Sequence, residues 1–204
     1  MRRALLLLLV SVILLPSCLF VKAPDEKVDV QNVALSPQPE IPMSDELVRT
    51  RAGDLIALLP KTWVFLDTKN EASAEIISVA VNPEYTLSMV VSAIPGAESS
   101  KESMESDGLL GLARATFQKH LRKTGGLAKL VGSYRIAQLG ARRFAAFDFS
   151  TNGGSLRTRC AVCVSSLGNS YEIALVPLTV TGKDVPDPLE QERVFRSILA
   201  TVQY

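Results

Sequence analysis

Two cysteines separated by two residues, Cys160 and Cys163, have the spacing that most directly suggests chemistry. In thiol oxidoreductases such a pair opens a helix, whose N-terminus lowers the pKa of the thiol. Here the pair lies in an alternating run typical of a β-strand, where residues three apart point to opposite faces and lie about 10 Å apart. A disulfide requires Cα atoms within about 7 Å. We therefore expect two structural cysteines that do not pair with each other.

His120 is the only histidine in the chain, which argues against a His-rich metal site and against a catalytic triad based on histidine. It falls at the edge of an apolar helical stripe, near the end of the predicted helix. We interpret it as a solvated helix residue rather than as a ligand or a base. The sequence also contains no phosphate loop, no nucleophile elbow and no zinc-protease motif. We therefore expect no catalytic residue, no metal site and no cofactor.

Three arginines, Arg142, Arg157 and Arg159, fall on neighbouring predicted strands and offer a grip for an anionic partner. Asp148 and Glu172 are interspersed among them. We interpret the group as the solvated face of a sheet, with ion pairs across the strands.

The charge and cysteine counts narrow the class of protein. The 22 Lys and Arg residues nearly balance the 21 Asp and Glu residues, so the chain has no field that would attract nucleic acid. Three cysteines are too few for a secreted domain stapled by disulfides. We therefore expect stability to come from a hydrophobic core.

The N-terminus has the parts of an export signal. Arg2 and Arg3 precede the run Ala4–Leu15, which is aliphatic except for Ser11. The run is too short to cross a bilayer, because a spanning helix needs about 20 apolar residues.

The segment Leu15-Pro16-Ser17-Cys18 resembles the lipobox of bacterial lipoprotein precursors. An aliphatic residue stands three positions before the cysteine, and a small residue stands directly before it. The resemblance implies that residues 1–17 are a lipoprotein signal peptide and that Cys18 is lipidated and becomes the acylated N-terminus. Two or three acyl chains hold a protein stably on a membrane. An ordinary signal peptide with an incidental cysteine is the alternative.

Residues 18–44 are predicted to be a proline-rich linker. Its four prolines disfavour a helix or a central strand, and an extended chain of this length would lift a domain tens of ångströms off the bilayer. Leu19 is not the acidic retention signal of enterobacterial lipoproteins. That resemblance favours the outer membrane, facing the periplasm, if the organism is Gram-negative.

Residues 45–204 are predicted to form one domain in which alternating apolar runs indicate strands and two stripes of helical spacing indicate helices. Asp187 is the expected N-cap of the second helix, with Pro188 at its first position and Glu190 completing a capping box. Trp63 is expected in the core. The expected strands are Leu47–Arg51, Asp54–Leu59, Val64–Leu66, Glu75–Val81, Tyr85–Ile94, Ser133–Leu139, Arg142–Thr151, Gly154–Leu167 and Ser170–Leu178, and the expected helices are Ser103–Lys123 and Asp187–Gln203.

Two short turns predict the register of a three-stranded meander. Asn152-Gly153 is typical of a type I′ turn, and Gly168-Asn169 is typical of a type II′ turn. This register places Glu172 on the face that carries the arginines and leaves the other face apolar. The facing pairs that it predicts are Phe147 with Thr158, Asp148 with Arg157, Val162 with Leu175, and Cys163 with Ala174.

The order of strands, long helix, meander and closing helix resembles the PsbP/Mog1-like family, which includes bacterial PsbP-like lipoproteins. The likeness is carried by Pro60-Lys61-Thr62-Trp63 at the family's proline-to-tryptophan turn, by Leu139-Gly140-Ala141 at a turn between middle strands, and by Phe195–Val202 in the closing helix. Thr62 stands where glycine is common. The resemblance implies an α+β fold, with a mainly antiparallel β-sheet covered by helices in an α/β/α sandwich, that binds partners and has no enzymatic activity. The family's metal-binding positions are not carried over, because the histidines are absent.

We therefore expect a lipid-anchored extracytoplasmic binding or assembly-support lipoprotein of the bacterial cell envelope, without enzymatic activity. Its expected partners are the membrane, through the N-terminal acyl chains, and another envelope protein. Two alternatives stay open. One is a thiol-redox or other envelope enzyme that uses Cys160 and Cys163, which a reactive thiol of low pKa would favour. The other is a ligand-binding, stress-related envelope lipoprotein with a groove beside the sheet, which an unfilled pocket would favour.

Overall fold

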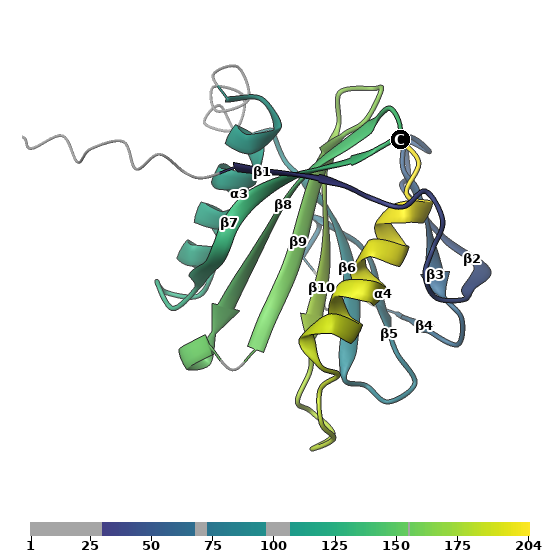
Figure 1. Ribbon diagram of the computed structural model, residues 1–204, viewed down its shortest axis with the longest axis vertical. Helices are drawn as coiled ribbons and strands as arrows, with labels where there is room; N and C mark the ends of the chain where they lie inside the picture. The colour runs from purple at the N-terminus through teal and green to yellow at the C-terminus, as the bar shows by residue number, and fades with distance from the viewer. Residues whose placement is uncertain (1–29, 68–72, 97–106, 155) are drawn as a thin grey trace, which may run out of the picture.

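A computed structural model describes residues 30–67, 73–96, 107–154 and 156–204 (Figure 1). The predicted signal peptide, the predicted lipidation site Cys18 and the start of the helix expected from Ser103 lie outside these residues. The described elements are the strands β1 (Val30–Ala34), β2 (Met43–Arg49), β3 (Ile56–Pro60), β4 (Val64–Leu66), β5 (Ile76–Val81), β6 (Leu87–Ile94), β7 (Lys129–Leu139), β8 (Arg142–Thr151), β9 (Leu156–Val164) and β10 (Ser170–Pro177), the helices α3 (Leu109–Lys123) and α4 (Pro188–Thr201), and the short 3₁₀ turn η1 (Asn152–Gly154).

The described strands form a large sheet and a separate hairpin. The large sheet has the order β1-β7-β8-β9-β10-β6-β5-β4, and β2 pairs with β3. The pair of β1 with β7 is parallel, and the other pairs are antiparallel. Helix α3 packs on one face of the sheet, and α4 packs with the β2–β3 hairpin on the other (Figure 1). The predicted mainly antiparallel sheet in an α/β/α sandwich is confirmed.

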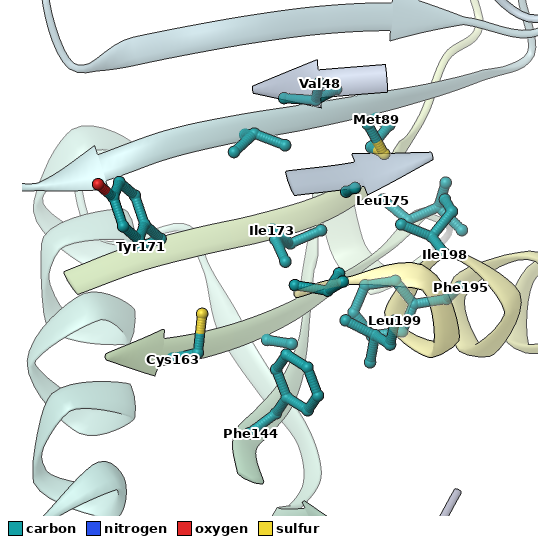
Figure 2. Packing of buried hydrophobic residues seen from close by; sticks show 14 of the residues in the cluster. Val48, Met89, Phe144, Cys163, Tyr171, Ile173, Leu175, Phe195, Ile198 and Leu199 are labelled. Carbon is teal, nitrogen blue, oxygen red and sulfur yellow. The ribbon is translucent and has the colours of Figure 1, made fainter. Parts of the chain in front are cut away.

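Each face of the sheet has its own hydrophobic core. On the α4 side, Ile173 and Leu175 of β10 pack with the α4 residues Phe195, Ile198 and Leu199 (Figure 2). The three α4 residues belong to the apolar stripe that helical spacing predicts.

Trp63 belongs to the core on the α4 side and is 7% exposed, so its predicted burial is confirmed. On the α3 side, Leu112, Ala113 and Phe117 pack against the sheet. The ring of Phe117 meets that of Phe147 edge-on at 6.0 Å between centroids.

Helix α4 begins as the sequence predicts. The Asp187 side chain accepts hydrogen bonds from the backbone N–H groups of Leu189 (2.8 Å) and Glu190 (2.9 Å), and Pro188 occupies the first helical position. The Glu190 carboxylate pairs with Arg193 rather than with the start of the helix. The predicted N-cap is confirmed.

The segment predicted as a linker differs from the structure in its second half. Strand β1 lies inside that segment and forms a parallel edge of the sheet, with Val30 opposite Tyr134 of β7. Further along, the Glu40 N–H donates a 2.9 Å hydrogen bond to the Ser197 hydroxyl of α4. The prolines at 37, 39 and 42 lie after this strand, so they do not prevent it from pairing. The folded part therefore includes residues from Val30 onwards.

The register of the meander also differs from the prediction. Phe147 lies opposite Cys160 rather than Thr158, because the β8–β9 connection contains four residues instead of two. This shift by two residues keeps each side chain on its predicted face.

The β9–β10 connection has a larger consequence. The Ser165 N–H donates to the Asn169 carbonyl oxygen at 2.8 Å, and Gly168 ends a three-residue loop with a positive φ of 81°. Val162 therefore lies opposite Glu172 rather than Leu175. The shift by three residues moves Glu172 to the α3 face of the sheet.

Candidate ligand-binding site

The last turns of α3 place polar side chains over the sheet. The apolar stripe of α3, which includes Phe117, seats the helix on β8 and β9. Helical spacing then puts Lys119, His120 and Lys123 at the edge of this stripe, beside β5, β6 and β10.

His120 forms a close pair with a carboxylate of the sheet. Its Nε2 lies 2.6 Å from Oε1 of Glu172 on β10, and the two side chains are 24% and 9% exposed. The imidazole ring stacks on Phe149 of β8, with 4.7 Å between the ring centroids. The stacking and the hydrogen bond together fix the orientation of the imidazole.

Cys160 of β9 completes a group of three donor residues with His120 and Glu172. One donor atom from each residue lies within 4.8 Å of the others. Burial raises the pKa of the Cys160 thiol well above its ordinary value, and the charge of Glu172 and a hydrogen bond with it act in the same direction. In this environment Cys160 is a protonated thiol beside an acceptor.

An ion pair borders this group on the solvent side. Lys119 Nζ lies 2.5 Å from the Glu75 carboxylate, and Lys123 Nζ lies 3.6 Å from it. The hydrogen bond from Lys119 lowers the pKa of Glu75, and the positive charges of the two lysines add to this effect against the opposing effect of burial.

These side chains surround a cavity of about 350 Å³, which we call the α3 pocket. Its wall is apolar where Phe149 and the aliphatic side chains of the sheet contribute, and its titratable side chains come from α3, from Glu75 and from Glu172 of β10. The residues that line it are Glu75, Ile76, Val90, Ser92, Lys119, His120, Lys123, Phe149, Thr158, Glu172, Ala174 and Val176.

The interpretation of His120 as a solvated residue without partners is wrong. Its partner Glu172 is 52 residues away in sequence. The predicted β9–β10 register had placed Glu172 on the opposite face of the sheet. A three-residue loop ending at Gly168 would have directed Glu172 toward α3. The sequence could therefore have predicted the His120–Glu172 pair if this loop had been assumed instead of a two-residue turn.

The two cysteines lie on opposite faces of β9, as the strand interpretation predicts. Cys160 belongs to the core under α3 and Cys163 to the core under α4, and both are buried and free. Figure 2 shows Cys163 pointing into the core on the α4 side. Cys163 faces Tyr171 rather than Ala174, which is the partner of Cys160.

The pKa values of both thiols are raised, whereas the thiols of a redox pair have lowered pKa values. Burial raises the pKa of Cys163 to about 12, with a smaller contribution from the charge of Asp54. Reactive thiols have a lowered pKa and partial exposure, and neither cysteine of this pair has these properties.

Arg159 does not belong to the solvated face that the sequence predicts. The Arg157 side chain does, since it is 42% exposed and lies 3.8 Å from Asp148, and Arg142 donates to the Val202 carbonyl oxygen. Arg159 and Asp148 are 3% and 1% exposed, and their side chains lie 3.1 Å apart beneath α4. Arg159 also pairs with Glu192 and donates to the Pro188 carbonyl oxygen at 2.8 Å. The prediction fails for Arg159 because α4 covers this part of the sheet and supplies partners that lie far along the chain.

A second cavity, of about 370 Å³, lies beside the N-terminal half of α4. Trp63 and four prolines contribute to its wall, and its charged side chains are Lys61, Glu84 and Glu190. The residues that line it include no histidine or cysteine, so it lacks the donors gathered in the α3 pocket.

Comparison with known proteins identifies the fold. No protein-family model matches the sequence, and no curated protein matches it significantly. The structure is similar to that of cyanobacterial PsbP (CyanoP) from Synechocystis sp. PCC 6803, with a TM-score of 0.53 and 13% identity over 78% of this chain and 92% of that chain.

Two further solved structures are more distantly similar. The Ran-binding protein Mog1p of Saccharomyces cerevisiae has a TM-score of 0.49 and 14% identity over 79% of this chain and 95% of that one. LpqN, involved in cell envelope biogenesis of Mycobacterium tuberculosis, has a TM-score of 0.42 and 13% identity over 79% and 90%. The fold is of the PsbP/Mog1 type. Among the described helices, none has the length and apolar character needed to cross a membrane.

Proposed function

We propose that this protein is a lipid-anchored, extracytoplasmic binding lipoprotein of the bacterial cell envelope, without enzymatic activity, that takes its ligand into the α3 pocket. The α3 pocket is the observation that carries the proposal. Its volume of about 350 Å³ falls in the range of small-ligand sites, which combine apolar walls with a few polar groups.

The side chains of the pocket favour binding over catalysis. Lys119 and Lys123 are both paired with Glu75, so neither offers a free amine as a nucleophile. The raised pKa of the Cys160 thiol and its position opposite Cys163 on the strand also argue against the thiol-redox alternative.

The proposed anchor rests on the sequence. Acylated at Cys18, the domain would face the periplasm from the outer membrane, tethered by the residues between Cys18 and β1. Another envelope protein is the proposed partner that delivers the ligand or receives it.

Metabolic labelling with an alkyne fatty acid tests the anchor. The wild type is expected to take up the label and to fractionate with membranes, and Cys18→Ala is expected to lose both properties. Cys163→Ser is the matched control and should keep both. A wild-type chain that takes up no fatty acid would refute the lipid anchor.

Site-directed photo-crosslinking in intact cells tests the pocket. A photoreactive residue in place of Lys123, at the rim, should trap the partner or ligand for identification by mass spectrometry. The same residue in place of Ala141, in the turn at the opposite end of β7, is the control and should not. Equal crosslinking at both positions would show that the pocket is not the site of binding.

A further inference from the structure

The α3 pocket has three metal-ligating side chains from three different elements at its inner end. His120 comes from α3, Cys160 from β9 and Glu172 from β10, and their donor atoms all lie within 4.8 Å of one another. The group forms only where α3 packs on β9 and β10. Elements of the core therefore hold it in place, and none of its three ligands comes from a loop.

The donor types select a class of metal. An imidazole nitrogen, a thiol sulfur and a carboxylate oxygen together suit a borderline-soft divalent ion, above all Zn²⁺. Mg²⁺ and Ca²⁺ prefer sites made of oxygen atoms alone.

The three donor atoms, all within 4.8 Å of one another, would need shifts of about 1 Å to bind one ion. Bonds of about 2.0–2.3 Å in a tetrahedral site put donor atoms roughly 3.2–3.8 Å apart. His120 Nε2 and Glu172 Oε1, at 2.6 Å, would move apart by about 0.6–1.2 Å as a metal replaces their hydrogen bond.

Three protein ligands leave one position of a tetrahedral site open. His120 and Glu172 both line the α3 pocket, whereas Cys160 is fully buried behind them. The open position would therefore face the pocket, where a water molecule or an atom of a ligand can occupy it.

We propose that His120, Cys160 and Glu172 bind one Zn²⁺ ion, with the fourth coordination position directed into the α3 pocket. This inference rests on the proposed function, because it makes the metal the recognition group of the same pocket. Cys160 coordinates as the thiolate, so its proton passes to solvent as the ion binds. The sequence did not predict this site, since its three ligands are dispersed and share no motif.

Titration of the untagged, metal-free mature chain with Co²⁺ tests the site, since cobalt reports thiolate coordination by its absorption. One Co²⁺ per chain is expected, with a thiolate-to-cobalt charge-transfer band and the strong visible bands of a four-coordinate ion, and Zn²⁺ should displace it. Cys160→Ser should lose the charge-transfer band, and Cys163→Ser, on the opposite face, should keep it.

A second variant covers the case in which Cys160→Ser does not fold. His120→Gln changes a partly exposed side chain and should weaken cobalt binding by roughly 100-fold or more while the chain stays folded. A wild type without the charge-transfer band, a Cys160→Ser variant that keeps it, or full affinity in His120→Gln would each overturn the metal site. A chain that carries fatty acid and crosslinks through the pocket but binds no cobalt would refute the metal alone and leave the proposed function standing.

Discussion

Thr62 has a backbone conformation that suits glycine. Its φ is 76°, in the left-handed region that a β-branched residue rarely adopts. It lies in the Pro60-Lys61-Thr62-Trp63 turn. The next residue, Trp63, belongs to the core on the α4 side.

Thr62→Gly is expected to raise the free energy of unfolding by about 0.5–1 kcal/mol. The relief of left-handed strain, about 1–2 kcal/mol, outweighs the extra chain entropy of glycine in the unfolded state. Thr62→Ala keeps a Cβ atom at the same φ and should bring no such gain. Urea unfolding of the three proteins compares them, and equal stability of Thr62→Gly and Thr62→Ala would contradict the strain.

The two core cysteines should be unreactive in the folded protein. Burial raises the pKa of both thiols, that of Cys163 to about 12, so little thiolate is present at neutral pH. Iodoacetamide should label Cys160 and Cys163 in urea but not under native conditions, as peptide mass spectrometry would show. A Cys160–Cys163 disulfide that cycles with thiol reagents would instead restore the redox alternative.

At the scale of elements, Asp54 ties the β2–β3 turn to the β9–β10 turn. Its carboxylate accepts hydrogen bonds from Thr50 (2.7 Å), Ser165 (2.6 Å), Asn169 (2.8 Å) and Tyr171 (2.7 Å). Burial favours the protonated form, but these four hydrogen bonds outweigh it and hold the pKa of Asp54 well below its ordinary value of 3.8. These hydrogen bonds stabilise the β9–β10 loop. The conformation of this loop sets the register of β10 and therefore the position of Glu172.

Asp54→Asn is expected to lower the free energy of unfolding by about 1–3 kcal/mol at neutral pH, because the amide cannot accept all four hydrogen bonds. The pKa of Asp54 is lower in the folded state, so its contribution is present above the ordinary pKa and is lost as the pH falls below it. The stability difference between wild type and variant should therefore shrink as the pH falls from about 5 to 2. A stability difference that stays constant over this pH range would contradict the lowered pKa of Asp54.

The elements also show how far local sequence signals reach. The hairpin at Ala52-Gly53 and the start of α4 at Asp187 follow from turn and capping residues, and both are present in the structure. The β9–β10 register does not follow, because Gly168 suits both the first position of a two-residue turn and the last position of a three-residue loop. The contacts of Asp54 with Ser165 and Asn169 help to choose between them, and those contacts join residues more than 100 positions apart.

At the scale of the whole molecule, the layered architecture could be predicted but the site could not. Alternating strands and two apolar helical stripes are sufficient to indicate a sheet covered on both faces. The α3 pocket needs the register of β10, the seating of α3 and the approach of β5, none of which is a local property. Likewise β1 forms a strand because it pairs with β7 at the edge of the sheet. Its own sequence has little of the alternating pattern that predicts a strand.

The two faces of the sheet differ in what they contain. The core under α4 contains a buried ion group and the closing helix, and it stabilises the fold. The layer under α3 is interrupted by the α3 pocket, where core residues give way to His120, Glu172 and the Glu75–lysine pair. In the proposed account the first face supports the domain and the second binds the ligand.

Native mass spectrometry of the protein, extracted from its own membranes in mild detergent, tests this account most directly. We expect the wild type to carry a bound ligand in addition to its acyl chains. Val176→Trp, which fills the α3 pocket, should abolish that added mass, and Val180→Trp, at an exposed position just beyond β10, should retain it. A ligand that remains bound in Val176→Trp, or a wild type that never carries more than its acyl chains, would contradict a binding function for the α3 pocket.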